Sequence, residues 1–232
     1  MTDTAIDLPI GFPLPDWQPA RLPERRVIDG VFARLEPLGS QHTADLFEAD
    51  LADHEGVTWT YMPDGPFPTL AAYQAYVTKC AATDDPLFFA IVERATNRAL
   101  GMASFMRISP AIGSIEIGWI HFSPALQQTV LATESLYLMM RESFVLGNRR
   151  LEWKCDSLNA ASNRAAIRLG FKYEGLFRQA TIYKNRNRDT CWYSILDCEW
   201  PRLDRGYQSW LAECAANNGV QKRSLAQAID DC

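Results

Sequence analysis

Hydrophobic and polar positions in the middle of the chain change their period once, and this change predicts a strand followed by a long helix. Over residues 115–122 the pattern alternates, which is typical of a strand. Its two faces would carry Glu116, Gly118 and Ile120 on one side, and Ile117 and Trp119 on the other. Pro124 then ends the strand, because proline has no N–H group for a ladder.

A helix is expected after this loop. Thr129 or Thr133 can cap its start, and it would run to Leu146 before Gly147-Asn148, a pair that tolerates a left-handed turn. Apolar residues occupy more than one side of the helix, so it should be covered on several sides.

The same patterns predict the remaining elements. Strands are expected at 31–35, 86–93, 99–108, 150–156, 171–178 and 189–200, and helices at 41–53, 69–82, 159–169 and 201–216. The strands at 115–122 and 150–156 should be parallel, because a helix connects them. The predicted fold class is α/β (α+β): a mixed, mostly antiparallel twisted sheet flanked by helices on both faces.

One main domain is expected between two extensions. Residues 1–30 form a proline-rich arm whose apolar residues favour draping over the domain. Residues 31–200 form the domain itself. Residues 201–232 form a last helix and, from about residue 217, a ragged tail.

Composition and charge exclude several classes of function. The net charge of −5 argues against nucleic-acid binding. Residues 1–20 contain no Lys or Arg, so no signal peptide is expected. No apolar run approaches the ~20 residues that span a membrane. The expected location is the cytoplasm.

Cysteine and histidine spacing predicts neither disulfides nor a metal site. Cys155, Cys191 and Cys198 lie in strand-like runs and are interpreted as buried free thiols of a reducing compartment. The three histidines share no ligand spacing, so no metal is expected.

Two motifs resemble the GNAT acetyltransferase superfamily. The run PALQQTVLATES, residues 124–135, resembles the loop that binds the pyrophosphate of acyl-CoA. Asn159-Ala-Ala-Ser162 followed by AAIRLGFKYEG, residues 165–175, is similar to the N-x-x-S…LGF-x-x-EG signature of the branch with ribosomal-protein alanine N-acetyltransferases. The resemblance covers residues 30–200 and implies a GNAT-like fold with acetyl-CoA as co-substrate and no metal.

The loop departs from the family pattern at two positions. The family usually has Gln/Arg-x-x-Gly-x-Gly/Ala, and the first two glycines are replaced by Gln128 and Val130. Glycine lets backbone N–H groups approach a pyrophosphate at a helix N-terminus. The resemblance implies that the loop binds the cofactor, with threonine hydroxyls replacing some backbone donors. Its residues are Gln127, Gln128, Thr129, Val130, Leu131, Ala132 and Thr133. An ordinary strand-to-helix connection is the alternative.

The resemblance also implies catalytic roles. The backbone N–H of Ile120 or its neighbour would polarise the thioester oxygen. Ser162 would be the acid for the leaving thiolate, and Asn159 would bind the pantetheine arm while capping its helix. Glu116 is the candidate base, and Tyr183, in a polar loop, is a weaker candidate acid. Local roles are the alternatives: a capping hydroxyl for Ser162 and a solvated charge for Glu116.

The acceptor is expected beside the aromatic, proline-rich segment 58–68. Trp59 and Tyr61 either pack on the core or form one wall of an acceptor pocket, and the resemblance places this segment beside the acceptor groove. The predicted function is acetyl-CoA-dependent N-acetylation of a primary amine, either a peptide N-terminus or a small amine, by direct attack. Nucleic acid and membrane are not expected as partners, and both monomer and homodimer remain open. The alternative is a non-catalytic member that binds CoA or a partner after losing the loop glycines.

Overall fold

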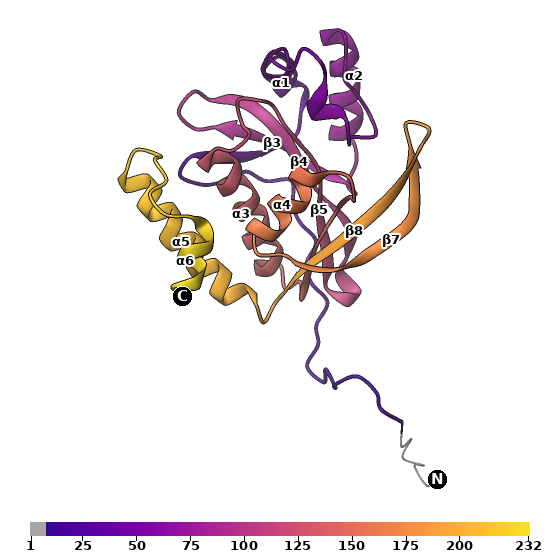
Figure 1. The fold of residues 1–232 in the computed structure, drawn as a ribbon, viewed down its shortest axis with the longest axis vertical. Helices are drawn as coiled ribbons and strands as arrows, with labels where there is room; N and C mark the ends of the chain where they lie inside the picture. Colours follow the sequence, from indigo (N-terminus) through magenta and orange to yellow (C-terminus); the bar gives the residue numbers. More distant parts are fainter. Residues whose placement is uncertain (1–7) are drawn as a thin grey trace.

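A single eight-stranded sheet organises the computed structural model, which describes residues 8–232 (Figure 1). The strand order is β1-β2-β3-β4-β5-β6-β8-β7. The strands are β1 Ile28–Asp29, β2 Ala33–Pro37, β3 Leu87–Glu93, β4 Arg98–Ser109, β5 Ser114–Phe122, β6 Arg150–Asp156, β7 Lys172–Tyr183 and β8 Arg186–Leu196. Neighbouring strands are antiparallel except β5 and β6, which are parallel. The predicted mixed, mostly antiparallel sheet is therefore confirmed.

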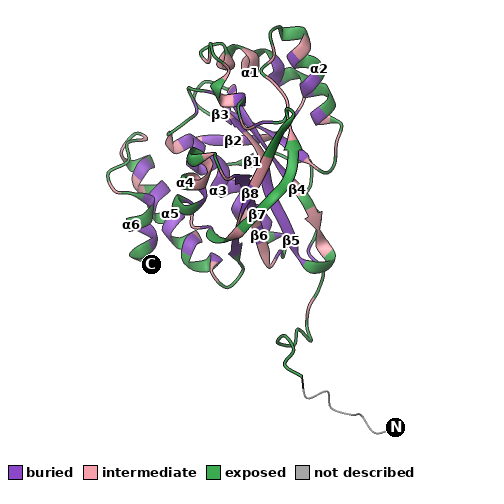
Figure 2. Cartoon of the chain, turned by 45° about the vertical axis from the view of Figure 1, so that its right-hand side comes forward, coloured by how far each residue is buried: buried purple, intermediate pink, exposed green. Residues whose placement is uncertain are grey.

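Helices cover both faces of the sheet. They are α1 Thr43–Asp50, α2 Leu70–Ala81, α3 Val130–Val145, α4 Ala160–Arg168, α5 Trp200–Ala216 and α6 Leu225–Asp230, with short 3-10 turns at Ser40–His42, Val57–Trp59 and Pro110–Ile112. One core lies under α1 and α2, and a larger core lies between the sheet and α3 to α6. Buried segments line both sides of the sheet in Figure 2. Within residues 8–232, no helix has the length and apolar character needed to cross a bilayer.

Side-chain caps begin three of the helices at the residues named from the sequence. Thr69 accepts a hydrogen bond from the backbone N–H of Ala72, at 3.2 Å. Thr129 and Asn159 do the same at the starts of α3 and α4. The ends of the two helices nearest the predicted site are therefore fixed by short-range contacts.

The last two strands form a hairpin that is longer than predicted. β7 and β8 meet at Lys184-Asn185, where both residues have positive φ, 48° and 58°. This is the backbone that a two-residue hairpin turn requires. The prediction of a polar loop from residue 183 is therefore wrong, because Tyr183 ends β7. Cys198 lies after β8 and is exposed, not buried in a strand as predicted.

The C-terminal residues are folded, in contrast to the ragged tail expected from the sequence. Ser224 and Gln227 form a reciprocal capping box that begins α6, and this S-x-x-Q signature is visible in the sequence. Leu225 and Ile229 of α6 are buried in the larger core. α6 packs against α5 at Gly206, where an added Cβ would lie 2.7 Å from the Cα of Ile229.

The arm is draped over the domain only in part. The Trp17 indole donates to the carbonyl of Ala111, and the Arg21 backbone N–H donates to Leu146. Residues 8–14 are exposed, which differs from the expectation that their apolar side chains pack on the domain. The end of the arm also joins the sheet as β1, and residues 1–7 lie outside the described residues.

Gly206→Ala should lower the melting temperature by several degrees. In an open helix this change gains about 0.5–1 kcal/mol, but forcing atoms against packed backbone costs about 1–3 kcal/mol. A loss of ~1 kcal/mol shifts the melt of a chain of this size by about 2–4 °C. Gly175→Ala is the control, because nothing lies within 4 Å of its added Cβ. An unchanged melt for Gly206→Ala in calorimetry would contradict the packing of α6 on α5.

Candidate active site

The parallel strands β5 and β6 are paired over only three residues and then separate. Ser114, Ile115 and Glu116 lie opposite Arg150, Leu151 and Glu152. Beyond this point β5 stays paired with β4, and β6 stays paired with β8. The separation opens the sheet between residues 117–122 and 153–156, in front of the starts of α3 and α4.

A β-bulge at Trp119 changes the direction of β5 beside this opening. Trp119 has φ of +50°, and the register with β4 shifts between Ser104–Gly118 and Met102–His121. As a result Trp119 packs toward the core under α1 and α2, while Ile120 packs with Ile117 on the other face. The predicted alternation, which put Ile120 on the face of Gly118, is wrong because a bulge inserts one residue. A bulge also leaves backbone groups unpaired, here at the edge of the opening.

Buried charges hold the last paired rung before the opening. Glu116 and Glu152 are direct cross-strand partners. The Lys154 ammonium lies 2.9 Å from Glu116 Oε2 and 2.6 Å from Glu152 Oε2. Arg107 donates to the same Glu116 oxygen at 2.7 Å. Glu116 is therefore a buried, doubly ion-paired carboxylate, not a charge on a solvated face.

These contacts give Glu116 a structural role in this arrangement. Its contacted oxygen already accepts from two cations, which is poor preparation for accepting a proton from an amine. Gly118, which lacks a side chain, leaves no open space beside Glu116, because an added Cβ would lie 2.4 Å from Met106 Sδ (a clash). The geometry does not support Glu116 as the base.

The loop before α3 contains a left-handed backbone conformation that glycine usually adopts, although no glycine is present there. Gln128 has φ of +60°, so this residue adopts the left-handed conformation that favours glycine, at the first of the two positions where the resemblance led us to expect glycine. Thr129 Oγ1 accepts from the Ala132 N–H at 3.0 Å. The N–H groups of Val130 and Leu131 occupy the first two positions of α3, where a helix offers no internal acceptor. Such an end is suited to an anion.

The threonine hydroxyls of this loop are already engaged. Thr129 Oγ1 also donates to the Leu126 carbonyl at 2.7 Å, and Thr133 Oγ1 donates to the Thr129 carbonyl at 3.3 Å. Arg168 of α4 reaches across and donates to Thr133 Oγ1 at 3.2 Å. A cation that the sequence did not single out therefore lies at the start of α3, because folding brings the end of α4 beside it.

Side-chain hydrogen bonds join the start of α4 to β6, the strand on one side of the opening. Ser162 Oγ accepts from the Trp153 indole N–H at 3.1 Å, a bond that does not use the hydroxyl proton. Asn159 Oδ1 caps the helix by accepting from the Ser162 N–H. Asn163 was not predicted as a site residue, yet its amide donates to three carbonyls around residues 156–159 and accepts from Tyr193. It fixes α4 to the end of β6.

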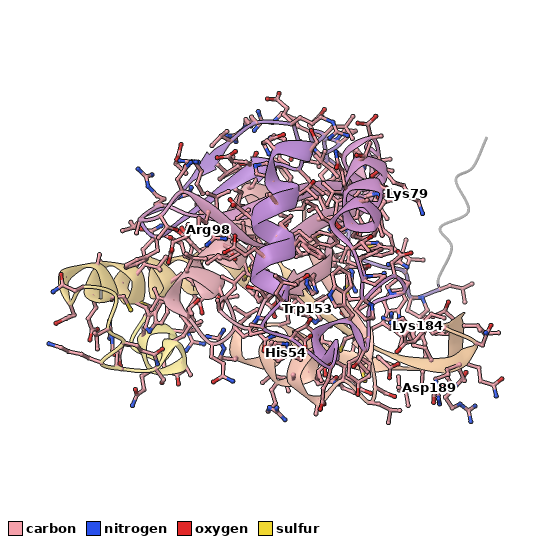
Figure 3. All side chains as sticks on the ribbon, turned by 90° about the horizontal axis from the view of Figure 1, so that it is seen from above. His54, Lys79, Arg98, Trp153, Lys184 and Asp189 are labelled. Atoms are coloured by element: carbon pink, nitrogen blue, oxygen red, sulfur yellow. The ribbon has the colours of Figure 1, made fainter. Side chains whose placement is uncertain are left out.

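The hairpin closes one side of the opening. Tyr183 donates to Asp156 Oδ2 at 2.8 Å, and burial together with this hydrogen bond raises the pKa of Tyr183 to about 12. Lys184 donates to the Trp59 carbonyl at 2.7 Å, where the hairpin tip approaches the segment between α1 and α2 (Figure 3). Trp153 and Lys184 are both labelled in that view.

Trp59 and Tyr61 have different environments in this segment. The Trp59 ring is 2% exposed and stacks on His121, with ring centroids 3.8 Å apart. Its side chain belongs to the core under α1 and α2. Tyr61 is half-buried and donates to the Leu158 carbonyl at 2.9 Å. Of the two, only Tyr61 contacts the loop that borders the opening.

Together, a split parallel strand pair, a bulge at its edge and a helix N-terminus at its mouth define an acyl-CoA-dependent acyltransferase. The Acetyltransferase (GNAT) domain model matches residues 33–172. The chain belongs to the GNAT acetyltransferase family and is an acyl-CoA N-acetyltransferase.

Solved structures agree with this assignment. A GCN5-related N-acetyltransferase from Brucella melitensis is 43% identical, with a TM-score of 0.90 over 94% of this chain and 100% of its own. A GNAT-family protein from Chromobacterium violaceum is 39% identical, with a TM-score of 0.77 over 84% of this chain and 98% of its own. No curated protein matches.

The neighbours include ribosomal-protein acetyltransferases, the branch that the motifs indicated. One is an acetyltransferase from Salmonella typhimurium that modifies the N-terminal serine of ribosomal protein L7/L12. It is 21% identical, with a TM-score of 0.63 over 74% of this chain and 99% of its own. At this identity the similarity concerns the fold.

Arg168→Gln should weaken acetyl-CoA binding about 10- to 100-fold in calorimetry, the loss expected for one hydrogen bond between charged groups. The reason is that Arg168 can turn from Thr133 to a pyrophosphate at the start of α3. Arg141→Gln, on a later turn of α3 beside Tyr137, removes the same net charge and should leave the dissociation constant unchanged. Equal effects of the two substitutions would contradict a pyrophosphate position beside Arg168.

Proposed function

We propose that this enzyme transfers the acetyl group of acetyl-CoA to a primary amine of low pKa, such as a peptide N-terminus or an amino-acid-like small molecule. The observation that carries the proposal is the opening between β5 and β6 after only three paired residues. The pantetheine arm of the co-substrate would lie edge-on between the two strands, with the N-terminal end of α3 available for a pyrophosphate.

The residues present suit this co-substrate. Residues 127–133 would hold the pyrophosphate, chiefly through backbone N–H groups and Arg168, because the side chains of Leu131, Ala132 and Thr133 are buried. Asn159 would meet the pantetheine arm at the start of α4. Acetyl-CoA supplies an acyl group activated as a thioester and a thiol that can leave.

The residues at the opening would then each have a role in acetyl transfer. The backbone N–H of Ile120, or of its neighbour in the bulge, would donate to the thioester oxygen. As the amine nitrogen bonds to the carbonyl carbon and the carbon–sulfur bond breaks, Ser162 would donate a hydrogen bond to the sulfur. The amine loses one proton and the thiolate gains one. Tyr183, held by Asp156, would stay protonated near neutral pH and border the acceptor together with Tyr61.

The preference for an amine of low pKa follows from the lack of a prepared base. At pH 7 a lysine-like amine with a pKa of about 10.4 is neutral in only about 1 part in 2,500, a deficit of about 4.6 kcal/mol. An α-amine with a pKa of about 7.7 to 8.0 has a deficit of only about 1 kcal/mol. The Salmonella protein, which shares this fold, modifies the N-terminal serine of a ribosomal protein, an amine of the class proposed here.

Ser162→Ala should lower kcat about 10- to 100-fold, at or below the usual contribution of a general acid, because the thiolate loses its donor. Affinity for acetyl-CoA should stay the same, since the Asn159 cap uses the Ser162 backbone and not its hydroxyl. Ser157→Ala, a serine replaced just before α4, is the control. The assay is thiol release with the best acceptor of a screen. An unchanged kcat for Ser162→Ala would contradict the role of Ser162 as the acid. The hydroxyl would then serve only as a structural hydrogen-bond partner of the Trp153 indole.

The rate with an α-amine acceptor should rise between pH 6 and about pH 8 and then level off, because the neutral amine becomes abundant there. Glu116→Gln should lower the melting temperature, since it removes a charge from a buried ion pair, but should keep the shape of this profile. A profile that loses its rise in Glu116→Gln would instead make Glu116 the base. High turnover of a simple alkylamine at pH 7 would contradict the α-amine preference.

A non-catalytic role for this chain has a distinct signature. Acetyl-CoA would then bind, and thiol would be released with none of the α-amine, alkylamine or peptide acceptors in the screen. Catalysis by this chain predicts release above the rate of hydrolysis with at least one α-amine.

A further inference from the structure

The exposed part of the N-terminal arm has an unusually regular pattern. Its even positions are apolar, Leu8, Ile10, Phe12 and Leu14, and its odd positions are Pro9, Gly11, Pro13 and Pro15. All four apolar side chains are exposed, with Ile10 at 86% and Phe12 at 74%. The arm extends away from the body of the domain (Figure 1). In an extended chain the four apolar side chains would share one face.

The prolines of this segment also make its two backbone edges different, because all three lie on the same edge. Successive N–H groups of an extended chain point to opposite edges, so the prolines remove donors from one edge only. The other edge keeps the N–H groups of the even residues. The segment is therefore suited to join a sheet as a terminal strand, with the proline edge outward.

The same chain has an exposed sheet edge of matching character. β7 is the last strand of the sheet, and no residue of it is buried. It carries the exposed apolar side chains Tyr173, Leu176, Phe177 and Ile182, with Phe177 at 52% and Ile182 at 78%. Several exposed apolar side chains along one edge strand favour an interaction site there.

Charge on the two segments is complementary. Residues 1–20 contain three aspartates and no Lys or Arg. Residues 172–188 contain five basic residues and one acidic residue, a net charge of +4. An acidic, apolar arm and a basic, apolar edge should attract each other and repel copies of themselves.

We propose that residues 8–14 pack along β7 of a second copy of this chain, which joins two copies by exchange of their arms. Within one copy both surfaces stay exposed, although the Arg149 guanidinium lies 5.9 Å from the centre of the Phe12 ring. The hydrogen bonds that anchor the arm come later in the chain, from Trp17 to Ala111 and from Ala20 to Pro110. Reciprocal docking in a two-fold dimer covers both surfaces of both copies. The contact would lie along the outer edge of β7, the strand that ends at Tyr183 beside the opening. The proposal is argued from exposure, pattern and charge, and does not rest on the proposed function.

Sedimentation equilibrium of the full chain tests the dimer. Ile10→Lys places a cation against the basic hairpin, and Ile182→Glu places an anion against the acidic arm. Each should raise the dimer dissociation constant at least ten-fold. Val220 is exposed to 60% on the C-terminal side, so Val220→Lys and Val220→Glu are controls that should have no effect. A monomeric wild type at micromolar concentrations, or equal effects of the Val220 and Ile10 changes, would overturn the proposal.

Cysteine cross-linking tests which surfaces meet. The exposed Cys198 and Cys232 are first replaced by serine, which leaves four buried thiols. Mixing Ile10→Cys with Leu176→Cys chains should give a disulfide-linked dimer that neither variant gives alone. A linked dimer from Ile10→Cys alone would mean that arms pair with arms. A monomeric disulfide in the doubly substituted chain would mean that the arm folds onto its own β7. Either result contradicts the exchange.

Discussion

The Lys154 ammonium lies between two carboxylates at the one place where the sheet runs parallel. Glu116 and Glu152 face each other across β5 and β6, and like charges in such a position repel. Lys154 contacts both, at 2.9 and 2.6 Å, and Arg107 and Arg150 complete the cluster. Removing one partner of a buried ion pair typically costs about 3–5 kcal/mol, because the remaining charge is left without compensation. The three-residue ladder is thus held by charge as well as by hydrogen bonds.

The opening depends on this rung because the strands separate directly after it. β5 turns through the bulge at Trp119, and β6 continues with β8 to Asp156. Each of the two helices at the opening is held by hydrogen bonds of one of its own side chains, distant in sequence for α3 and local for α4. The Glu134 carboxylate accepts hydrogen bonds from the backbone N–H groups of residues 31–33 and so binds α3, near its start, to the beginning of β2. Asn163 binds α4 to the end of β6. The gap between β5 and β6 is therefore bordered by strands and helices that are held by other contacts, while the two strands are not paired across it.

Much of this arrangement is predictable from the sequence, for local reasons. Thr69, Thr129 and Asn159 act as caps because capping is decided within four residues, and the helix between two strands predicts their parallel pairing. The features that the sequence did not predict depend on backbone conformation or on packing between distant segments. A tryptophan with positive φ looks like any other strand residue, so the bulge and the face of Ile120 could not be read from alternation.

Two further differences between the predicted and the observed site also arise from distant packing or backbone conformation. The ion pairs of Glu116 come from three strands, and the approach of Arg168 to Thr133 requires the fold to bring α4 beside α3. The loop lacks the glycines that the family pattern led us to expect, yet Gln128 adopts the left-handed form itself. By contrast, the capping box of α6 was present in the sequence as Ser224-x-x-Gln227 and could have been found.

The central claim is that acetyl-CoA enters between β5 and β6 with its pyrophosphate at the start of α3. Amide hydrogen exchange with and without saturating acetyl-CoA tests it most directly, because each region has its own amides. The account predicts protection concentrated in two segments, residues 118–122 of β5 and residues 128–132 before and in α3. Protection confined to other segments, with these two unchanged although acetyl-CoA is bound, would contradict it.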